Sequence, residues 1–215
     1  MLPLNEIITG DARELAREIS DESIALIFTD PPYLREYLPL YHWLTQEAAR
    51  VLVPGGWLFA YGPGEYIPDV LDLMRGCGLT YFWIFALLHN GGYPRVWYKN
   101  LMSGYKPVFV FTKGKPSRLP WQASVGSVAA DKQFHEWGQG VGFAFKTIDI
   151  LTSSEDTVWD PFVGGGTTAA ACKMLGRNYL AFEIDPGTAQ IARDRLLNTQ
   201  PPLFVLQPEQ LSLDG

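Results

Sequence analysis

The sequence lacks the usual marks of a secreted, membrane-spanning or metal-binding protein. Only 2 of its 215 residues are cysteines, and Cys77 and Cys172 lie far apart without the spacing of a metal site. No apolar run approaches the ~20 residues that a transmembrane helix needs, and the first six residues lack the basic and apolar regions of a signal peptide. We therefore expect a cytoplasmic protein with reduced thiols, no bound metal and no membrane contact.

Acidic residues are missing from one long segment. The chain has a net charge of −6, yet the segment from Leu73 to Ala130 contains no aspartate or glutamate. Its basic residues are interleaved with tyrosines and tryptophans, a combination that can neutralise phosphates and stack on bases. We expect the segment to bind a nucleic acid, and the alternative is an ordinary solvated face. The residues expected to contact phosphates are Arg95, Lys99, Lys106, Lys113, Lys115 and Arg118.

The motif Asp30-Pro31-Pro32-Tyr33 follows a continuous apolar run at residues 24–28. Such a run is typical of a strand buried on both faces of a parallel sheet, and two prolines must end it. A carboxylate, a fixed carbonyl and an aromatic ring then lie together at the carboxyl end of a strand, where open α/β sheets bind ligands. The carboxylate and the carbonyl can accept both hydrogens of an exocyclic amino group, and the aromatic ring can stack on the heterocycle that carries this group. The alternative is an aspartate that caps a turn beside a rim aromatic.

A glycine-rich motif, Asp160-Pro161-Phe162-Val163-Gly164-Gly165-Gly166-Thr167-Thr168, lies between a predicted strand and a predicted helix. The glycines allow a ligand close to the backbone, and the helix N-terminus offers free N–H groups to a carboxylate. The next strand ends in Glu183, which can accept both hydroxyls of a ribose. The spacing also imitates a dinucleotide fingerprint, so a nicotinamide or flavin oxidoreductase is the second interpretation. The aspartate that opens the loop disfavours a pyrophosphate and suits a ligand with an ammonium group.

Predicted strands alternate with predicted helices along most of the chain. This alternation indicates an α/β fold, with a mostly parallel sheet of about seven strands and helices on both faces. We expect a stop at Pro54-Gly55-Gly56 to end one helix, and a loop from about Lys113 to Gly142. The predicted strands are residues 7–9, 24–28, 57–61, 81–88, 108–111, 158–159 and 179–182.

Together the two motifs, with Gly10-Asp11-Ala12 upstream and Gly176-Arg177-Asn178-Tyr179 downstream, resemble those of the amino-methylating DNA methyltransferases. That family uses S-adenosylmethionine to methylate the exocyclic nitrogen of adenine or cytosine. The motif order resembles the β group, a circular permutation of the usual methyltransferase sheet. The resemblance implies a Rossmann-like S-adenosylmethionine-dependent methyltransferase fold. It also implies a single domain over residues 1–215, with residues 89–142 as a loop-rich insert that contacts DNA.

The resemblance also implies roles for individual residues. Asp30 and Pro31 would bind the target amino group, and Tyr33 would stack on a flipped-out base, with Pro32 completing the catalytic loop. The residues that would bind the cofactor are Asp11, Ala12, Asp30, Asp160, Phe162, Gly164, Gly165, Gly166, Thr167, Thr168, Glu183 and Ile184. The chain departs from the family at Gly165, where a serine is usual.

The resemblance implies a DNA methyltransferase of a restriction-modification type, prokaryotic or phage-encoded, that converts S-adenosylmethionine to S-adenosylhomocysteine without a metal. We expect adenine N6 as the target, with cytosine N4 as the first alternative. The next alternative is a methyltransferase for RNA or a protein amide. It ranks below DNA because such relatives tend to begin the loop with asparagine, where this chain has Asp30. A non-catalytic nucleic-acid-binding relative and an oxidoreductase are the remaining interpretations. DNA is the expected partner, and both a monomer and a homodimer are open.

Overall fold

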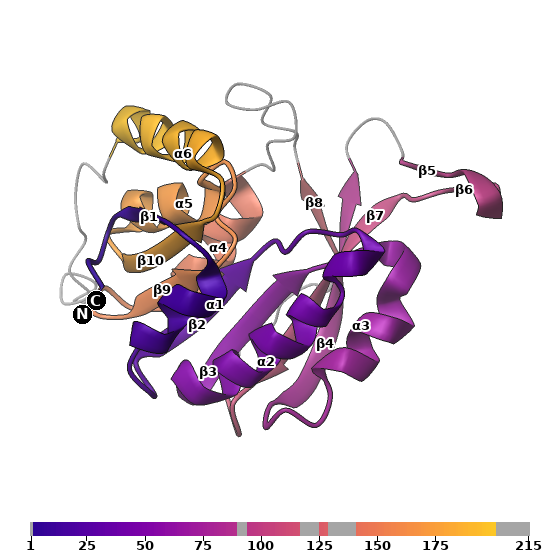
Figure 1. Ribbon diagram of the computed structural model, residues 1–215, viewed down its shortest axis with the longest axis horizontal. Helices are drawn as coiled ribbons and strands as arrows, with labels where there is room; N and C mark the ends of the chain where they lie inside the picture. The colour runs from indigo at the N-terminus through magenta and orange to yellow at the C-terminus, as the bar shows by residue number, and fades with distance from the viewer. Residues whose placement is uncertain (1, 90–93, 117–124, 129–140, 201–215) are drawn as a thin grey trace, which may run out of the picture.

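An eight-stranded sheet crosses the computed structural model, which describes residues 2–89, 94–116, 125–128 and 141–200 (Figure 1). The order is β1-β10-β9-β2-β3-β7-β4-β8, and β7 is antiparallel to both of its neighbours while all other pairs are parallel. The strands are β1 Ile7–Thr9, β2 Ile24–Thr29, β3 Leu52–Tyr61, β4 Thr80–His89, β7 Tyr105–Thr112, β8 Val125–Val128, β9 Thr157–Asp160 and β10 Asn178–Glu183. The prediction of a mostly parallel α/β sheet is confirmed.

Helices cover both faces of this sheet, as predicted (Figure 1). The α-helices are α1 Ala12–Leu15, α2 Pro39–Val51, α3 Ile67–Met74, α4 Val141–Leu151, α5 Thr167–Leu175 and α6 Pro186–Asn198. Short 3-10 turns lie at Ala16–Glu18, Arg35–Tyr37, Gly64–Tyr66 and Trp97–Lys99. A separate two-stranded sheet joins β5 Arg95–Val96 and β6 Leu101–Met102. No helix in the described ranges is long and apolar enough to cross a membrane.

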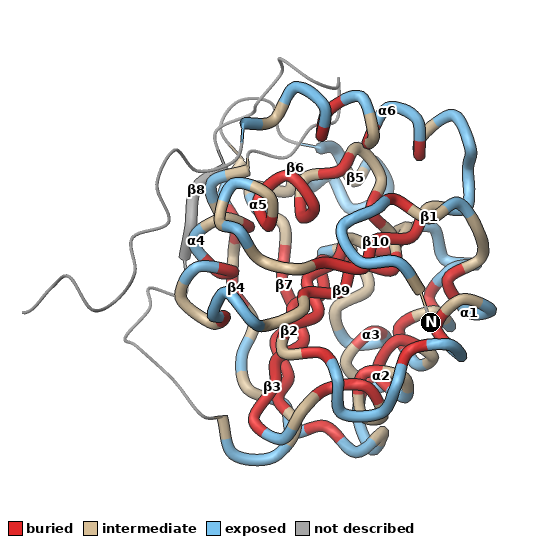
Figure 2. Tube along the Cα trace, turned by 90° about the vertical axis from the view of Figure 1, so that its left-hand side faces the viewer, coloured by how far each residue is buried: buried red, intermediate tan, exposed pale blue. Residues whose placement is uncertain are grey.

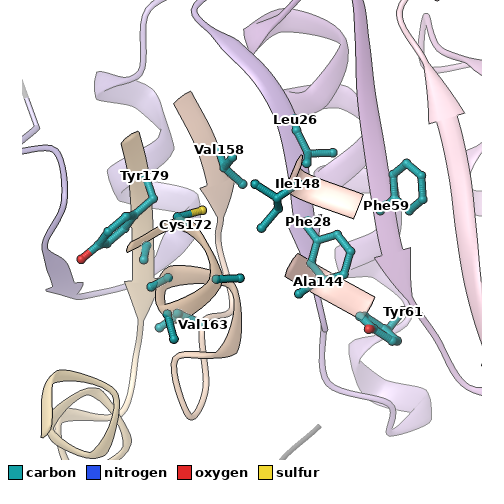
Figure 3. Close-up of a cluster of buried hydrophobic side chains, with 14 of the residues drawn as sticks. Leu26, Phe28, Phe59, Tyr61, Ala144, Ile148, Val158, Val163, Cys172 and Tyr179 are labelled. Carbon is teal, nitrogen blue, oxygen red and sulfur yellow. The ribbon is translucent and has the colours of Figure 1, made fainter. Parts of the chain in front are cut away.

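Strand β2 shows why a continuous apolar run is needed at the centre of the sheet. Its alternate residues enter different hydrophobic clusters, because successive side chains of a strand point to opposite faces. Leu26 and Phe28 belong to the cluster beside α4, α5 and α6, and Ile27 to the cluster beside α1, α2 and α3. Figure 3 shows Leu26 and Phe28 near Ile148 of α4, and Figure 2 shows buried residues gathered in the central strands.

Two local predictions are wrong. Helix α2 ends at Val51, and Pro54-Gly55-Gly56 lies within β3 instead of stopping the helix. The glycines belong to the strand because Gly55 N–H donates to Lys113 O at 2.7 Å and Lys113 N–H donates to Gly56 O at 3.0 Å. The predicted loop from Lys113 also contains β8, which pairs in parallel with β4 and brings the sheet to eight strands.

The strand order confirms the circular permutation. The first strand, β1, pairs with β10, which pairs with β9, although these two come from the end of the chain. If strands are counted from β9, the order of the first seven reads 3-2-1-4-5-7-6, the doubly wound pattern with an antiparallel strand near one edge. The order reverses between β9 and β2, so this is the topological switch point where such sheets bind ligands.

Candidate active site

The two sequence motifs meet at this switch point. Asp30 directly follows β2, and Asp160 ends β9, the strand beside it. The Thr29 hydroxyl donates to Asp160 Oδ1 at 2.7 Å, and the Thr168 hydroxyl donates to Phe28 O at 3.3 Å. The structure therefore brings together motifs that are separated by 130 residues in the chain (160 − 30).

Asp160 is a buried carboxylate, only 4% exposed. Burial raises its pKa to about 6, and the hydroxyls of Thr168 and Thr29 and the Phe162 N–H oppose that rise. The Phe162 N–H donates to Asp160 Oδ1 at 3.1 Å. A buried acid of this kind favours a cationic ligand, because an opposite charge nearby stabilises its ionised form.

Two of the three glycines in the glycine loop have backbone conformations that favour glycine, and the third does not. Gly164 and Gly166 have positive φ angles of 49° and 80°, and a Cβ on Gly166 would lie 3.1 Å from the Ala192 Cβ. Gly165 has no such restriction, and nothing lies within 4 Å of the position where its Cβ would be. The structure thus explains how the chain can have glycine where the family usually has serine, since the position is open to a side chain but does not depend on one.

Arg195 is a site residue that the sequence reasoning missed. Its side chain is 95% buried, as its relative exposure of 5% shows, and Nη1 donates to Gly165 O and to Thr167 Oγ1, both at 3.1 Å. These bonds hold the glycine loop from the side of α6. The available signal was a charged residue on the face of the last helix that carries Ala189 and Ala192.

Glu183 ends β10 beside the glycine loop. Its carboxylate accepts the Gly164 N–H and the Asp185 N–H, each at 3.0 Å, which fixes its orientation. Ile184, the next residue, is 66% exposed despite its apolar side chain. An oriented carboxylate can accept hydrogen bonds from a pair of ligand hydroxyls, and the exposed aliphatic side chain next to it can pack against a flat ring of the same ligand.

Asp11 lies at the neighbouring strand end, since Thr9 is in register with Glu183. Its carboxylate caps α1 by accepting the Arg13 N–H at 2.8 Å. The Arg13 guanidinium also bonds to this carboxylate at 2.6 Å and, as the main cause, holds its pKa below the ordinary value. Ala12 is buried directly behind it.

The catalytic loop has internal contacts that the sequence did not predict. The Tyr33 hydroxyl donates to Asp30 Oδ1, and Lys106 Nζ lies 3.3 Å from Asp30 Oδ2. The ammonium of Lys106 also lies 4.8 Å from the centre of the Tyr33 ring and 5.2 Å from that of Tyr61. Burial, with Asp30 as the next cause, raises the pKa of Tyr33 well above its usual range, so the phenol remains a donor.

The basic residues expected to contact phosphates do not form one surface. Lys106 lies at the catalytic loop, whereas Lys113 lies beyond the far end of β7, where its Nζ is 3.0 Å from Glu22 Oε1. Lys115 follows Lys113 at that same opposite edge. Lys113 and Lys115 therefore lie at the edge of the sheet opposite the catalytic loop, apart from Lys106. Arg118 lies outside the described residues, as do parts of the predicted insert at 89–142.

Arg95 and Lys99 lie instead on a short hairpin, Arg95–Met102, which we call the arm. In Figure 1 the arm projects from the molecule beyond β7. Trp97 and Tyr98 at its tip are 73% and 71% exposed, and each has a cation over its ring: Arg95 at 5.1 Å and Lys99 at 5.5 Å. Apolar and basic side chains thus share one exposed element without an acidic residue.

The arm is attached at the same edge of the sheet as the catalytic loop. His89 N–H, at the end of β4, donates to Gly104 O at 3.0 Å, and β7 begins at the next residue, Tyr105. Lys106 follows at once and reaches Asp30. Among the described residues, no group of three or more histidine, cysteine, aspartate or glutamate side chains could hold a metal ion.

Comparison with solved structures identifies the fold. A complex described as M1.HpyAVI with SAM superposes with a TM-score of 0.71 at 24% identity, over 89% of this chain and 98% of that one. A methyltransferase described as PvuII, cytosine-N4-specific, superposes with a TM-score of 0.75 at 17% identity, over 91% and 93%. A Thermus thermophilus protein described as a DNA modification methylase superposes with a TM-score of 0.74 at 21% identity, over 91% and 95%. The fold is that of the S-adenosylmethionine-dependent methyltransferases.

Sequence comparisons agree with the fold. Residues 127–194, which include the glycine loop and Glu183, match the family model described as DNA methylase. The type II methyltransferase M.BamHI of Bacillus amyloliquefaciens is 27% identical over 91% of this chain, which spans 57% of that relative. M.HinfI of Haemophilus influenzae is 25% identical over 92% of this chain, which spans 70% of that protein. The family model and these relatives together support an amino-methylating DNA methyltransferase.

Proposed function

We propose that the protein transfers a methyl group from S-adenosylmethionine to the exocyclic amino group of a flipped-out DNA base, with adenine N6 as the target. The observation that carries the proposal is the meeting of Asp30 and Asp160 at the switch point through the 2.7 Å bond between Thr29 and Asp160. The Asp-Pro-Pro-Tyr form of the loop is our reason for placing adenine before cytosine. The family model described as DNA methylase and the relatives named as type II methyltransferases support the substrate class.

The residues around the glycine loop fit S-adenosylmethionine. Asp160 would face its ammonium group, the α5 N-terminus its carboxylate, and Glu183 its ribose hydroxyls. Ile184 would cover its adenine with an exposed aliphatic side chain. Gly164 and Gly165 leave room beside the backbone, because a Cβ on either would have no atom closer than 4.0 Å. The bound cofactor supplies an electrophilic methyl group on a sulfonium.

The catalytic loop would activate and orient the target amine. An aromatic amine is a poor nucleophile, because its lone pair is delocalised into the ring. Asp30 and the Pro31 carbonyl would accept its two hydrogens, which returns electron density to nitrogen and aims the lone pair. This is catalysis by positioning and electrostatics, without a covalent enzyme intermediate. Tyr33 would contribute its ring to the base, and stacking on an aromatic side chain is worth about 1–3 kcal/mol.

The arm would contact DNA beside the flipped base. Extrusion of a base costs roughly a few kcal/mol, and exposed aromatic rings can offset part of it by stacking. Trp97 and Tyr98 are such rings, while Arg95 and Lys99 would neutralise phosphates. The arm's attachment beside Lys106 keeps it on the catalytic edge of the sheet.

Mass spectrometry of nucleosides tests the proposal directly. Unmethylated genomic DNA is incubated with the protein and S-adenosylmethionine, then digested and analysed for N6-methyladenine and N4-methylcytosine. We expect N6-methyladenine. N4-methylcytosine would keep the enzyme class and change the base, whereas methylation of RNA alone, or of neither nucleic acid, would refute the proposal.

The variant Asp30→Ala separates chemistry from cofactor binding. We expect it to abolish methyl transfer while the thermal shift produced by S-adenosylhomocysteine stays near that of the wild type, because Asp30 would contact mainly the target amine. Glu183→Ala is the matched control, since loss of a ribose contact should reduce the thermal shift as well. Normal turnover by Asp30→Ala would refute the assigned role.

A further inference from the structure

Lys106 has an unusual position for a lysine in a basic segment. It is the second residue of β7, and because β7 is antiparallel its first residues lie beside Tyr61 at the end of β3. The side chain is only 21% exposed, with its ammonium 3.3 Å from Asp30 Oδ2 and beside the rings of Tyr33 and Tyr61. The ammonium therefore has one carboxylate and the faces of two aromatic rings as its neighbours.

An ordinary ion pair does not account for this arrangement. Lysine–carboxylate pairs near the surface contribute little to stability, and the chain has another at Lys113 and Glu22, far from the catalytic loop and without the aromatic rings that surround Lys106. Lys106 instead extends into an aromatic-lined site at the switch point, where ligands bind. Any planar base that stacks on Tyr33 and reaches Asp30 must meet its ammonium.

We propose that Lys106 is a specificity-determining residue that donates a hydrogen bond to the ring nitrogen next to the target amino group. This inference rests on the proposed methyl transfer to DNA. The carboxylate of Asp30 and the ammonium of Lys106 present an acceptor and a donor side by side, 3.3 Å apart. When a base enters, the pair opens and each group takes one partner on the base edge.

Base chemistry gives the pair its selectivity. Adenine and cytosine both carry an amino donor next to a ring-nitrogen acceptor, N6 beside N1 in adenine and N4 beside N3 in cytosine. Guanine and thymine present the reverse order on the same edge, a carbonyl acceptor beside an N–H donor. A keto base would set its carbonyl against the Asp30 carboxylate and its N–H against Lys106. The pair therefore accepts amino bases and rejects keto bases before any methyl transfer.

A single-atom change in DNA tests the hydrogen bond. In 1-deazaadenine the ring nitrogen N1 is replaced by C–H, so the acceptor is lost while the amino group remains. On a duplex with this base at the target position, we expect wild-type kcat/KM to fall by about 10- to 100-fold, the usual effect of losing a bond to a charged group. For a cytosine target the equivalent probe is 3-deazacytosine.

The variant Lys106→Met completes a double-mutant cycle. It should be slower on normal DNA, yet its kcat/KM should differ less than about threefold between adenine and 1-deazaadenine, because the donor is already absent. Changes in base pairing and amine reactivity caused by the analogue affect both enzymes and cancel in the ratio. Lys106→Arg keeps a charged donor and should keep most of the sensitivity to the analogue.

Lys113→Met is the matched control. Lys113 belongs to the same basic segment, is equally exposed at 21% and pairs with a carboxylate, but lies at the other end of β7. It should show the wild-type ratio between the two substrates. If wild-type enzyme methylates adenine and 1-deazaadenine equally well, or if Lys106→Met keeps the full penalty, the inference is wrong while the proposed function stands. If no DNA is methylated at all, both fail.

Discussion

Asp160→Asn should stabilise the protein at neutral pH while weakening cofactor binding. The carboxylate is 4% exposed, and burial raises its pKa from 3.8 to about 6. Because the folded-state pKa lies above the unfolded value, the native state holds its proton longer than the unfolded chain does. The contribution of Asp160 to the free energy of unfolding is therefore greatest below about pH 4, declines as pH rises, and reaches its minimum above pH 6.

The size of the effect follows from the shift. A difference of about two pKa units corresponds to about 3 kcal/mol. Asparagine is uncharged and nearly the same shape, so it can still accept from Thr29 and the Phe162 N–H, and its amide can donate to the Thr168 hydroxyl. The variant should match the wild type near pH 4 and exceed it by up to about 3 kcal/mol at pH 7. For a chain of this length that corresponds to a gain of about 6–12 °C in Tm.

Urea or thermal unfolding of both proteins between pH 4 and pH 8 measures the difference. Asp185→Asn serves as control, because hydrogen bonds from Thr188 lower the pKa of Asp185. Its contribution has the opposite sign: it is present above the unfolded pKa and lost as pH falls through the folded pKa. A pH-independent difference between Asp160→Asn and wild type would refute the reasoning about the buried charge.

The same variant tests why the chain keeps a buried acid. If Asp160 faces the cofactor ammonium, S-adenosylhomocysteine should bind the wild type more tightly as pH rises from 5 to 7, and the variant should lose this trend. Isothermal titration calorimetry across the same buffers measures both. Equal affinity of wild type and variant at pH 7 would mean that the carboxylate serves the loop alone, through Thr29 and Thr168.

Further predictions concern the glycine loop and the arm. Gly165→Ser should leave Tm and cofactor affinity nearly unchanged, whereas Gly166→Ser should cost about 2 kcal/mol or more in chemical unfolding, because of its positive φ and the contact with Ala192. Replacing Arg95 and Lys99 by alanine should flatten the slope of log K against log salt by up to about 2 in fluorescence anisotropy with a duplex. The same change at Lys113 and Lys115 should leave that slope as in the wild type, and the reverse result would place DNA at the other edge of the sheet.

The parts of the site that could be predicted from sequence are those fixed by short-range chemistry. Two prolines must end a strand, so Asp30 had to lie at a strand end, and the structure confirms it. The glycine-rich run was likewise predicted to form a loop between a strand and a helix, and it lies between β9 and α5. Alternation of strands and helices then sends both motifs to the carboxyl edge of one sheet.

Contacts that depend on how loops and helices pack could not be predicted in this way. Stacking on a base requires only the ring of Tyr33, yet its hydroxyl donates to Asp30. The bond depends on how the loop folds back on itself after Pro32, which neither periodicity nor composition determines. Arg195 likewise reaches the glycine loop only because α6 packs against it.

The basic segment shows most clearly what composition leaves undetermined. Lys106 and Lys113 are seven positions apart (113 − 106), and as charges in a sequence they are equivalent. A strand rises about 3.4 Å per residue, so the two lysines are separated by about 24 Å along the direction of β7. The direction of β7 decides which of them reaches Asp30: were β7 parallel to β3, its end rather than its beginning would lie at the catalytic edge. The location of a positive charge in this site thus depends on the sense of one strand, and that sense is set by pairing with β3 and β4 rather than by the basic residues themselves.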